Sequence, residues 1–61
     1  MTRLLRRAEV EVRTGLKRSS IYAAIKAGTF PKPIAISARS VGWLEGELDA
    51  WISARIEDRS L

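Results

Sequence analysis

Apolar positions in the second quarter of the chain recur with the spacing of a helix. The i, i+3, i+4, i+7 pattern of one buried stripe is formed by Ile21, Ala24, Ile25 and Gly28. Gly28 is also the expected end of the helix, because glycine adopts the left-handed C′ conformation without strain and a proline follows soon after. The pattern predicts a helix over residues 18–27.

The face of this helix opposite the apolar stripe is small, polar and basic. At ~100° per residue it carries Ser19, Tyr22, Ala23 and Lys26, with Arg18 at its edge. The face contains no acidic residue. It is therefore the first candidate for a surface that contacts a partner.

The segment of residues 7–13 fits two patterns. Val10 and Val12 alternate with charges, as in a half-buried strand. Helical spacings of 3, 4 and 4 instead connect Leu5, Ala8, Val12 and Leu16. We interpret the segment as a helix, because a tight turn at Thr14-Gly15 and the clearer helix follow it.

Two short strands are predicted after the second helix. β-branched and aromatic residues form runs at residues 34–36 and 41–43, on either side of a four-residue tip at 37–40. Pro33 fits the start or edge of a strand. The pattern predicts a hairpin with Arg39 projecting from its tip.

A third helix is predicted from residue 44 to about residue 58. Its apolar stripe consists of Leu44, Leu48, Trp51, Ile52 and Arg55, and its other faces are acidic. Arg55 should lay its methylene groups over a tryptophan and keep its charge in water. So small a protein needs its large apolar side chains inside, so the expected core includes Phe30, Trp43, Leu48 and Trp51.

Composition excludes most catalytic and metal-binding classes. The 61 residues include no cysteine and no histidine, which excludes disulfides, ordinary zinc sites and imidazole bases. This length suits a single domain over residues 1–61. We expect no enzymatic activity, no cofactor or metal and no small-molecule ligand. With no apolar run of ~20 residues and a basic N-terminus, we expect a cytoplasmic protein without membrane contact.

The charges are unevenly distributed. Residues 1–39 contain nine Lys and Arg and two Glu, a formal charge of +7, whereas residues 40–61 carry −3. A basic end of this kind suggests a polyanionic partner.

The order of elements is that of a winged helix-turn-helix: mostly α, with three helices and a two-stranded wing. The second helix fits the major groove of DNA with one face free for base edges. Its N-terminal amides, with Lys17 and Arg18, would meet phosphate. Lys32 and Arg39 on the hairpin would reach a neighbouring backbone or the minor groove.

Several sequence blocks together resemble the AlpA-type prophage regulators, which are similar to phage excisionases and to the winged DNA-binding head of MerR-type activators. The blocks are Arg3-Leu4-Leu5-Arg6, Glu9-Val10, Thr14-Gly15-Leu16, Arg18-Ser19-Ser20-Ile21-Tyr22, residues 25–33, Val41-Gly42-Trp43-Leu44 and Trp51-Ile52. The resemblance implies a DNA-binding regulator of prophage transcription, integration or excision. It implies reading-helix contacts at Arg18, Ser19, Ser20, Tyr22 and Lys26, and wing contacts at Lys32 and Arg39.

The chain departs from this family pattern at two places. Lys17 stands where such proteins often have a capping serine, so the helix cap is either lost or moved to Ser19. Arg7 and Arg13 stand where apolar residues are usual, which leaves the packing of the first helix open.

The expected partner is double-stranded DNA, bound by a homodimer or a cooperative assembly because one short module contacts few base pairs. The sequence leaves activation, repression and excision open. The alternative is a protein-interaction adaptor or antitoxin-like subunit that docks through its amphipathic C-terminal helix.

Overall fold

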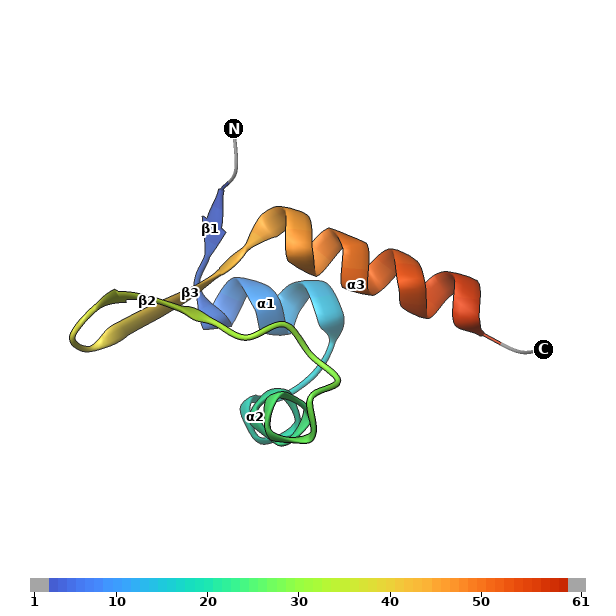
Figure 1. Cartoon of the computed structure of the whole chain (residues 1–61), viewed down its shortest axis with the longest axis horizontal. Helices are drawn as coiled ribbons and strands as arrows, with labels where there is room; N and C mark the ends of the chain where they lie inside the picture. Colours follow the sequence, from blue (N-terminus) through green and yellow to red (C-terminus); the bar gives the residue numbers. More distant parts are fainter. Residues whose placement is uncertain (1–2, 60–61) are drawn as a thin grey trace.

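Two helices joined by a tight turn are followed by a β-hairpin and a third helix (Figure 1). The computed structural model describes residues 3–59. Its elements are β1 (Leu4–Leu5), α1 (Arg7–Thr14), α2 (Arg18–Ala27), β2 (Ile34–Ser37), β3 (Ser40–Leu44) and α3 (Glu45–Asp58). The predicted fold class, three helices with a small β-hairpin as in a winged helix-turn-helix, is confirmed.

The hairpin belongs to a three-stranded antiparallel sheet with the order β1-β3-β2. Ser37 pairs with Ser40, so the tip is a two-residue turn at Ala38 and Arg39 instead of the predicted four residues. The sequence did not predict β1, because two residues are too few to leave a periodic pattern. In β1, Leu5 pairs with Trp43 and is fully buried.

The first segment is a helix, as predicted, and its buried face is the one that carries Val10. Val10 is fully buried, whereas Val12 is 84% exposed and Ala8 is exposed. Positions 10 and 12 lie ~200° apart on a helix, so only one of the two valines can face the core. Leu5 reaches the core from β1 and not from the predicted helical stripe.

Glycines end both α1 and α2 in the left-handed conformation. Gly15 has φ 74° and donates its N–H to the carbonyl of Glu11. Gly28 has φ 80°, and its N–H and that of Thr29 reach back to the carbonyls of Ile25 and Ala24, a Schellman motif. The predicted end of α2 is confirmed.

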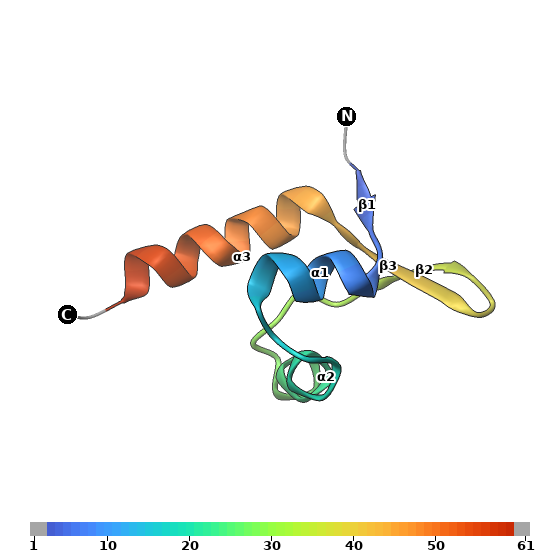
Figure 2. The ribbon, with the colours of Figure 1, turned by 180° about the vertical axis from the view of Figure 1, so that it is seen from behind.

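The tight turn after α1 sets α2 at a steep angle to it. Figure 1 shows α1 across the view and α2 nearly end-on, and both views place α1 between α2 and α3 (Figures 1 and 2). One long face of α2 is therefore left uncovered by α3.

The core draws side chains from α1, α2, α3, two strands and the loop after α2. Its buried members are Leu5, Val10, Ile21, Phe30, Trp43 and Leu48. The core prediction is confirmed for Phe30, Trp43 and Leu48, and Trp51 is half-buried against this cluster.

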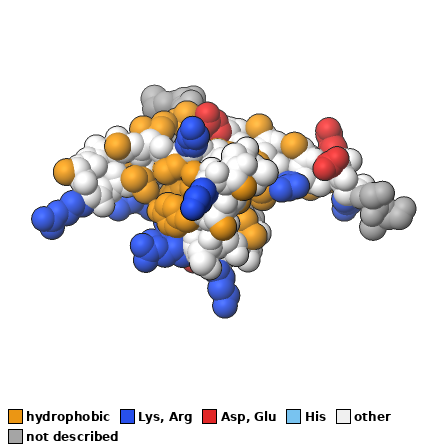
Figure 3. Space-filling model, turned by 60° about the horizontal axis from the view of Figure 1, so that its bottom comes forward, with side chains coloured by type: hydrophobic (Ala, Val, Ile, Leu, Met, Phe, Trp, Pro, Cys, Tyr) orange, Lys and Arg blue, Asp and Glu red, His pale blue; other side chains and the backbone are white. Residues whose placement is uncertain are grey.

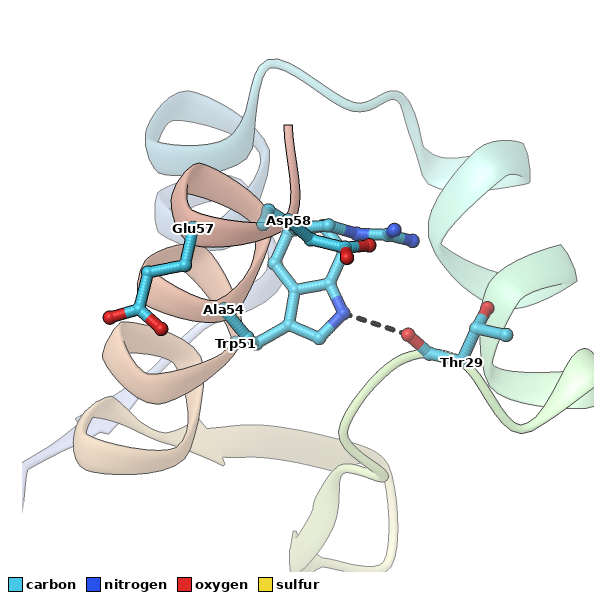
Figure 4. Close-up of a pocket in the computed structure, with 6 residues that line it drawn as sticks. Thr29, Trp51, Ala54, Glu57 and Asp58 are labelled. Carbon is cyan, nitrogen blue, oxygen red and sulfur yellow. Dashed lines mark hydrogen bonds between the residues drawn. The ribbon is translucent and has the colours of Figure 1, made fainter. Parts of the chain in front are cut away.

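Both tryptophans hold the loop that follows α2. The indole N–H of Trp43 donates to the carbonyl of Pro31 at 2.9 Å, and that of Trp51 donates to the carbonyl of Thr29 at 2.7 Å (Figure 4). Between these two bonds, the Phe30 ring packs edge-on against Trp51 with 4.8 Å between centroids. Because α2 ends just before this loop, these contacts fix the helix relative to α3 and the sheet.

Two arginines contact side chains of α3. Arg13 of α1 pairs with Glu45 at 2.9 Å and with Asp49 at 3.8 Å. Within α3, Arg55 packs on a tryptophan as expected, but its guanidinium and not only its methylene groups lies over the ring, 5.1 Å from the centroid of Trp51. None of the helices within residues 3–59 is long and apolar enough to cross a membrane.

Candidate nucleic-acid interface

The outer face of α2 is exposed along its whole length. Its exposed residues are Arg18, Ser19, Tyr22 and Lys26. Tyr22 is only 38% exposed, so much of its side chain packs against neighbouring residues. On the opposite face Ile21 is fully buried and anchors the helix. Exposure and side-chain type on this face match the sequence prediction, and the contacts themselves stay predictions.

The N-terminus of α2 has no side-chain cap. Lys17 occupies the N-cap position with extended backbone angles, and within residues 17–27 no side chain caps the first turn. The structure thus decides between the two alternatives: the cap is lost and has not moved to Ser19. The first-turn amides therefore remain free to bind an anion.

Ser20 lies on a different side of α2 from the other predicted contacts. It lines a groove of about 550 Å³ that also involves Ala24 of α2 and Trp51, Ile52 and Ile56 of α3. The helical period explains this separation, because Ser20 lies ~200° from Arg18.

The predicted wing, residues 32–43, consists of the end of the loop after α2 and most of the β2–β3 hairpin, and it brings two basic residues to the surface. Lys32 follows α2 in the loop held by the tryptophans, and Arg39 occupies the two-residue turn. The backbone N–H of Arg39 lies 3.4 Å from the Ser37 hydroxyl oxygen. Both side chains are exposed.

A cleft of about 490 Å³ lies where α1, α2 and the wing meet. The residues that line it are Arg6, Arg7, Ala8, Arg18, Tyr22, Arg39, Ser40 and Val41. The cleft thus brings three predicted contacts together: Arg18, Tyr22 and Arg39. Lys17, Ser19, Lys26 and Lys32 lie outside it.

The sequence analysis did not single out Arg6 and Arg7 as site residues. Arg6 reaches the cleft because β1 pairs with β3, and its guanidinium lies 3.4 Å from the Ser40 hydroxyl, 34 residues away. Arg7 lines the same cleft and pairs with Glu11 at 3.1 Å. The pairing of the unpredicted strand β1 with β3 brings Arg6 to the wing, so local sequence carried no signal for it.

Five of the seven acidic residues of the sequence lie in α3. Figure 3 shows Lys and Arg side chains projecting from the face turned to the viewer, and the few acidic side chains visible in it lie mainly near the upper and right edges. In α3, Glu45 and Asp49 pair with Arg13, and Glu57 and Asp58 line an open pocket of about 600 Å³ beside Trp51 (Figure 4). Among residues 3–59 no group of three acidic side chains is placed to hold a metal ion.

Residues 3–56 match the family described as "Prophage CP4-57 regulatory protein (AlpA)". The chain belongs to the AlpA family. It is 42% identical over 57 residues to the uncharacterized protein ORF88 of Enterobacteria phage P4, a match that covers 93% of this chain and 65% of that protein. It is also 39% identical over 59 residues to the DNA-binding transcriptional activator AlpA of Escherichia coli K12, covering 87% of this chain and 84% of that protein.

The AlpA match extends over every element that forms the site. It begins at the residue before β1 and ends near the C-terminus of α3, so α2, the wing and the cleft all lie inside it. The chain spans about two thirds of the length of the phage P4 protein.

Proposed function

We propose that this AlpA-family chain is a prophage regulator that binds double-stranded DNA with sequence selectivity, its residues forming one DNA-binding unit. The observation that carries the proposal is the exposed face of α2, which is basic and polar, includes no acid within residues 18–27 and begins at an uncapped N-terminus. The activity named for the E. coli relative supports the same function.

In this proposal α2 lies in the major groove. A helix with its side chains is about 10–12 Å across, which matches the width of that groove in B-DNA. Ser19, Tyr22 and Lys26 face the base edges, because they share the exposed side of the helix. Arg18 lies at the edge of this side, next to the DNA backbone. The core beneath Ile21 and the steep turn after α1 hold this face outward.

Phosphate contacts supply most of the affinity. Lys17 and the free amides of α2 meet one strand, and the wing residues Lys32 and Arg39 meet the backbone or minor groove beside it. With about six to eight such contacts, log Kd should change with log salt by roughly 0.9 per contact.

A fluorescence anisotropy titration tests the proposal. The probes are labelled duplexes from the DNA upstream of the gene and from the attachment site, with a scrambled duplex of equal length, over a salt series. Wild-type protein should bind with a steep salt dependence and prefer one duplex. Absence of binding to every duplex at low salt would exclude the function.

Two kinds of variant separate reading from anchoring. Lys26→Ala should cost about 1–3 kcal/mol on the preferred duplex and relax its preference at one base pair. Lys32→Ala should weaken binding to the preferred and scrambled duplexes by the same factor. If the two variants behave alike, Lys26 does not read a base.

We propose that the chain binds as a homodimer or a cooperative assembly, because a single α2 spans few base pairs. Analytical ultracentrifugation with and without a duplex measures the stoichiometry. One protein per duplex at saturating concentration would contradict assembly.

The binding serves either transcription or excision. Circularly permuted fragments distinguish the two, because an excision factor of this size works by bending DNA into a recombination complex. A change of mobility with site position indicates a bend, and uniform mobility favours direct regulation of transcription.

The groove between α2 and α3 favours a second candidate, an adaptor or antitoxin-like subunit that docks through its C-terminal helix. This groove is lined by Ile52 and Ile56, the latter 53% exposed. A stoichiometric protein partner, together with no salt-dependent DNA binding, would favour this function over the first.

A further inference from the structure

We propose that the cleft between α1, α2 and the wing is the seat of one DNA backbone phosphate, held by Arg6, Arg18 and Arg39. This inference rests on the proposed DNA-binding function and adds a residue from outside α2 and the wing. It assigns Arg6 a role in binding, which neither its position in the sequence nor its element suggests.

The three arginines come from three separate elements. Arg6 lies between β1 and α1, Arg18 begins α2, and Arg39 forms the wing turn, yet all three line one cleft of about 490 Å³. A space of this size admits a phosphodiester group with its ribose edges. The cleft is also continuous with the outer face of α2 through Tyr22, whose ring centroid lies 6.0 Å from the Arg18 guanidinium.

The charge of these arginines is not neutralised within the described part of the chain. Arg6, Arg18 and Arg39 form no ion pair with any acidic side chain of residues 3–59, whereas Arg3, Arg7 and Arg13 all do. A fourth arginine of the cleft, Arg7, is paired with Glu11. Guanidinium groups that line one cleft without an ion-paired carboxylate suit an anion with several acceptor oxygens.

The backbone at the cleft supplies a second feature of an anion site. Arg6 is the N-cap of α1, and within residues 6–14 no side chain caps this helix. Ala8, in the first turn, lines the cleft, so this uncapped turn borders it, and the acid in the turn, Glu9, is paired with Arg3. The uncapped first turns of α1 and α2 both lie near the predicted path of the DNA strand.

Ser40 keeps Arg6 extended toward the wing. The hydroxyl oxygen of Ser40 lies 3.4 Å from the Arg6 guanidinium, and Arg39 is its neighbour in the turn. A phosphate in the cleft therefore contacts both the wing, through Arg39, and the body of the protein, through Arg6 and Arg18.

The occupant is a phosphodiester of duplex DNA and not a free anion, because the cleft lies between the two surfaces that the proposed function assigns to DNA. A strand that leaves the major groove at α2 passes this cleft before it reaches the wing. Inorganic phosphate alone would gain none of the contacts on either side.

Anisotropy titration of a fluorescein-labelled 20-bp duplex of arbitrary sequence, at low salt, tests the seat, because a phosphate contact does not depend on sequence. Arg6→Ala should weaken binding about tenfold and reduce the salt slope by roughly 0.9. Arg6→Lys, which keeps the charge and loses the planar fork, should fall between wild type and Arg6→Ala.

Arg59→Ala is the matched control, since it removes the same charge from an exposed arginine beside the groove between α2 and α3. It should weaken binding less than twofold. If Arg6→Ala weakens duplex binding no more than Arg59→Ala does, the cleft does not hold a phosphate. Failure of the wild type to bind any duplex contradicts DNA binding itself, a distinct result.

A double-variant cycle tests whether the arginines share one phosphate. If they do, Arg6→Ala combined with Arg39→Ala should lose less affinity than the product of the two single losses, because either substitution already opens the seat. A loss equal to the product would place the two arginines on separate phosphates and overturn the shared seat.

Circular dichroism melts check that each variant folds, and Arg6→Lys replaces Arg6→Ala if the latter does not. Excess inorganic phosphate should compete no better than sulfate at equal ionic strength; specific competition would identify a free-anion site.

Discussion

Helices α2 and α3 begin in opposite ways. α3 has two acidic residues in its first turn, Glu45 and Glu47, and their negative charges interact favourably with the positive end of the helix dipole. α2 has no acid in its first turn, and no side-chain hydrogen bond caps either helix at its N-cap, Lys17 or Leu44. The N-terminus of α2 thus lacks the charge stabilisation that α3 obtains from its own residues, and it leaves that end open to an external anion.

The two helices also differ in what they contribute to the core. α3 buries Leu48 and places Trp51 against Phe30, whereas α2 contributes Ile21 and is held largely through the loop that follows it. The residues of α3 thus stabilise the fold, and the outer residues of α2 remain free to contact a ligand. The residues that stabilise the fold and those that form the binding surface therefore lie largely on different helices, so stability and binding can be changed separately.

The largest effect is expected where the two helices are joined. Phe30→Ala should reduce the free energy of unfolding by about 3–5 kcal/mol, because it removes a buried ring from between α2 and the two tryptophans. Domains of this length have only about 3–9 kcal/mol in total, so most of the protein should unfold near 37 °C. Thermal denaturation followed by tryptophan fluorescence measures this.

Val12→Ala is the control for that experiment. Val12 is an apolar residue on α1 that is 84% exposed, so its truncation should change stability by less than about 0.5 kcal/mol. An equal loss of stability in Val12→Ala and Phe30→Ala would mean that Val12 is buried, so that α1 would turn the face of Val12 to the core and not the face of Val10.

An acid placed in the first turn of α2 should separate stability from binding. Ser19→Glu should stabilise the helix by about 0.3–1 kcal/mol through its dipole. The same variant should lose at least about tenfold in duplex affinity, because like charges brought together at an interface cost several kcal/mol. Ser53→Glu, on an exposed face of α3, adds the same charge and should leave affinity within about twofold. A loss of stability with Ser19→Glu would contradict the comparison.

Much of the fold follows from the sequence where one residue decides the local geometry. Periodicity and Gly28 predicted α2 to the residue, and the buried Phe30, Trp43 and Leu48 were predicted from size alone. The buried face of α1 stayed open at the level of sequence, because an eight-residue helix with two valines fits two stripes equally well. β1 was not predicted, since it becomes a strand only by pairing with β3.

The candidate site followed from the sequence only in part, for a related reason. The exposed face of α2 is a property of one helix and could be predicted from its pattern. The cleft is not a property of one helix and could not be predicted in this way, because Arg6 and Ser40 meet only when β1 joins the sheet. Ser20 shows the reverse case: resemblance grouped it with the reading residues, but the helical turn places it in the groove shared with α3.

Restoring the cap of α2 should shift the protein from binding toward stability. Lys17→Ser should raise the free energy of unfolding by about 1 kcal/mol, because a serine at the N-cap satisfies a free amide of the first turn. It should also lower duplex affinity and reduce the salt slope by roughly 0.9, since it removes one phosphate contact. Lys17→Ala, which loses the charge without adding a cap, should lower affinity equally with no gain in stability. Equal stability of the two variants would show that the N-terminus of α2 gains nothing from a cap.

The smallest effect is expected where α1 meets the acidic side of α3. Arg13→Ala removes ion pairs with Glu45 and Asp49 that are only partly shielded from water, so it should cost less than about 1 kcal/mol, and less still at high salt. Arg3→Ala, which breaks a more exposed pair with Glu9, should cost still less. Urea denaturation at two salt concentrations measures both. The duplex affinity of Arg13→Ala should stay within about twofold of wild type, because its charge is already neutralised by α3; a loss as large as that of Arg6→Ala would place Arg13 on the DNA and remove the division of roles between the two helices.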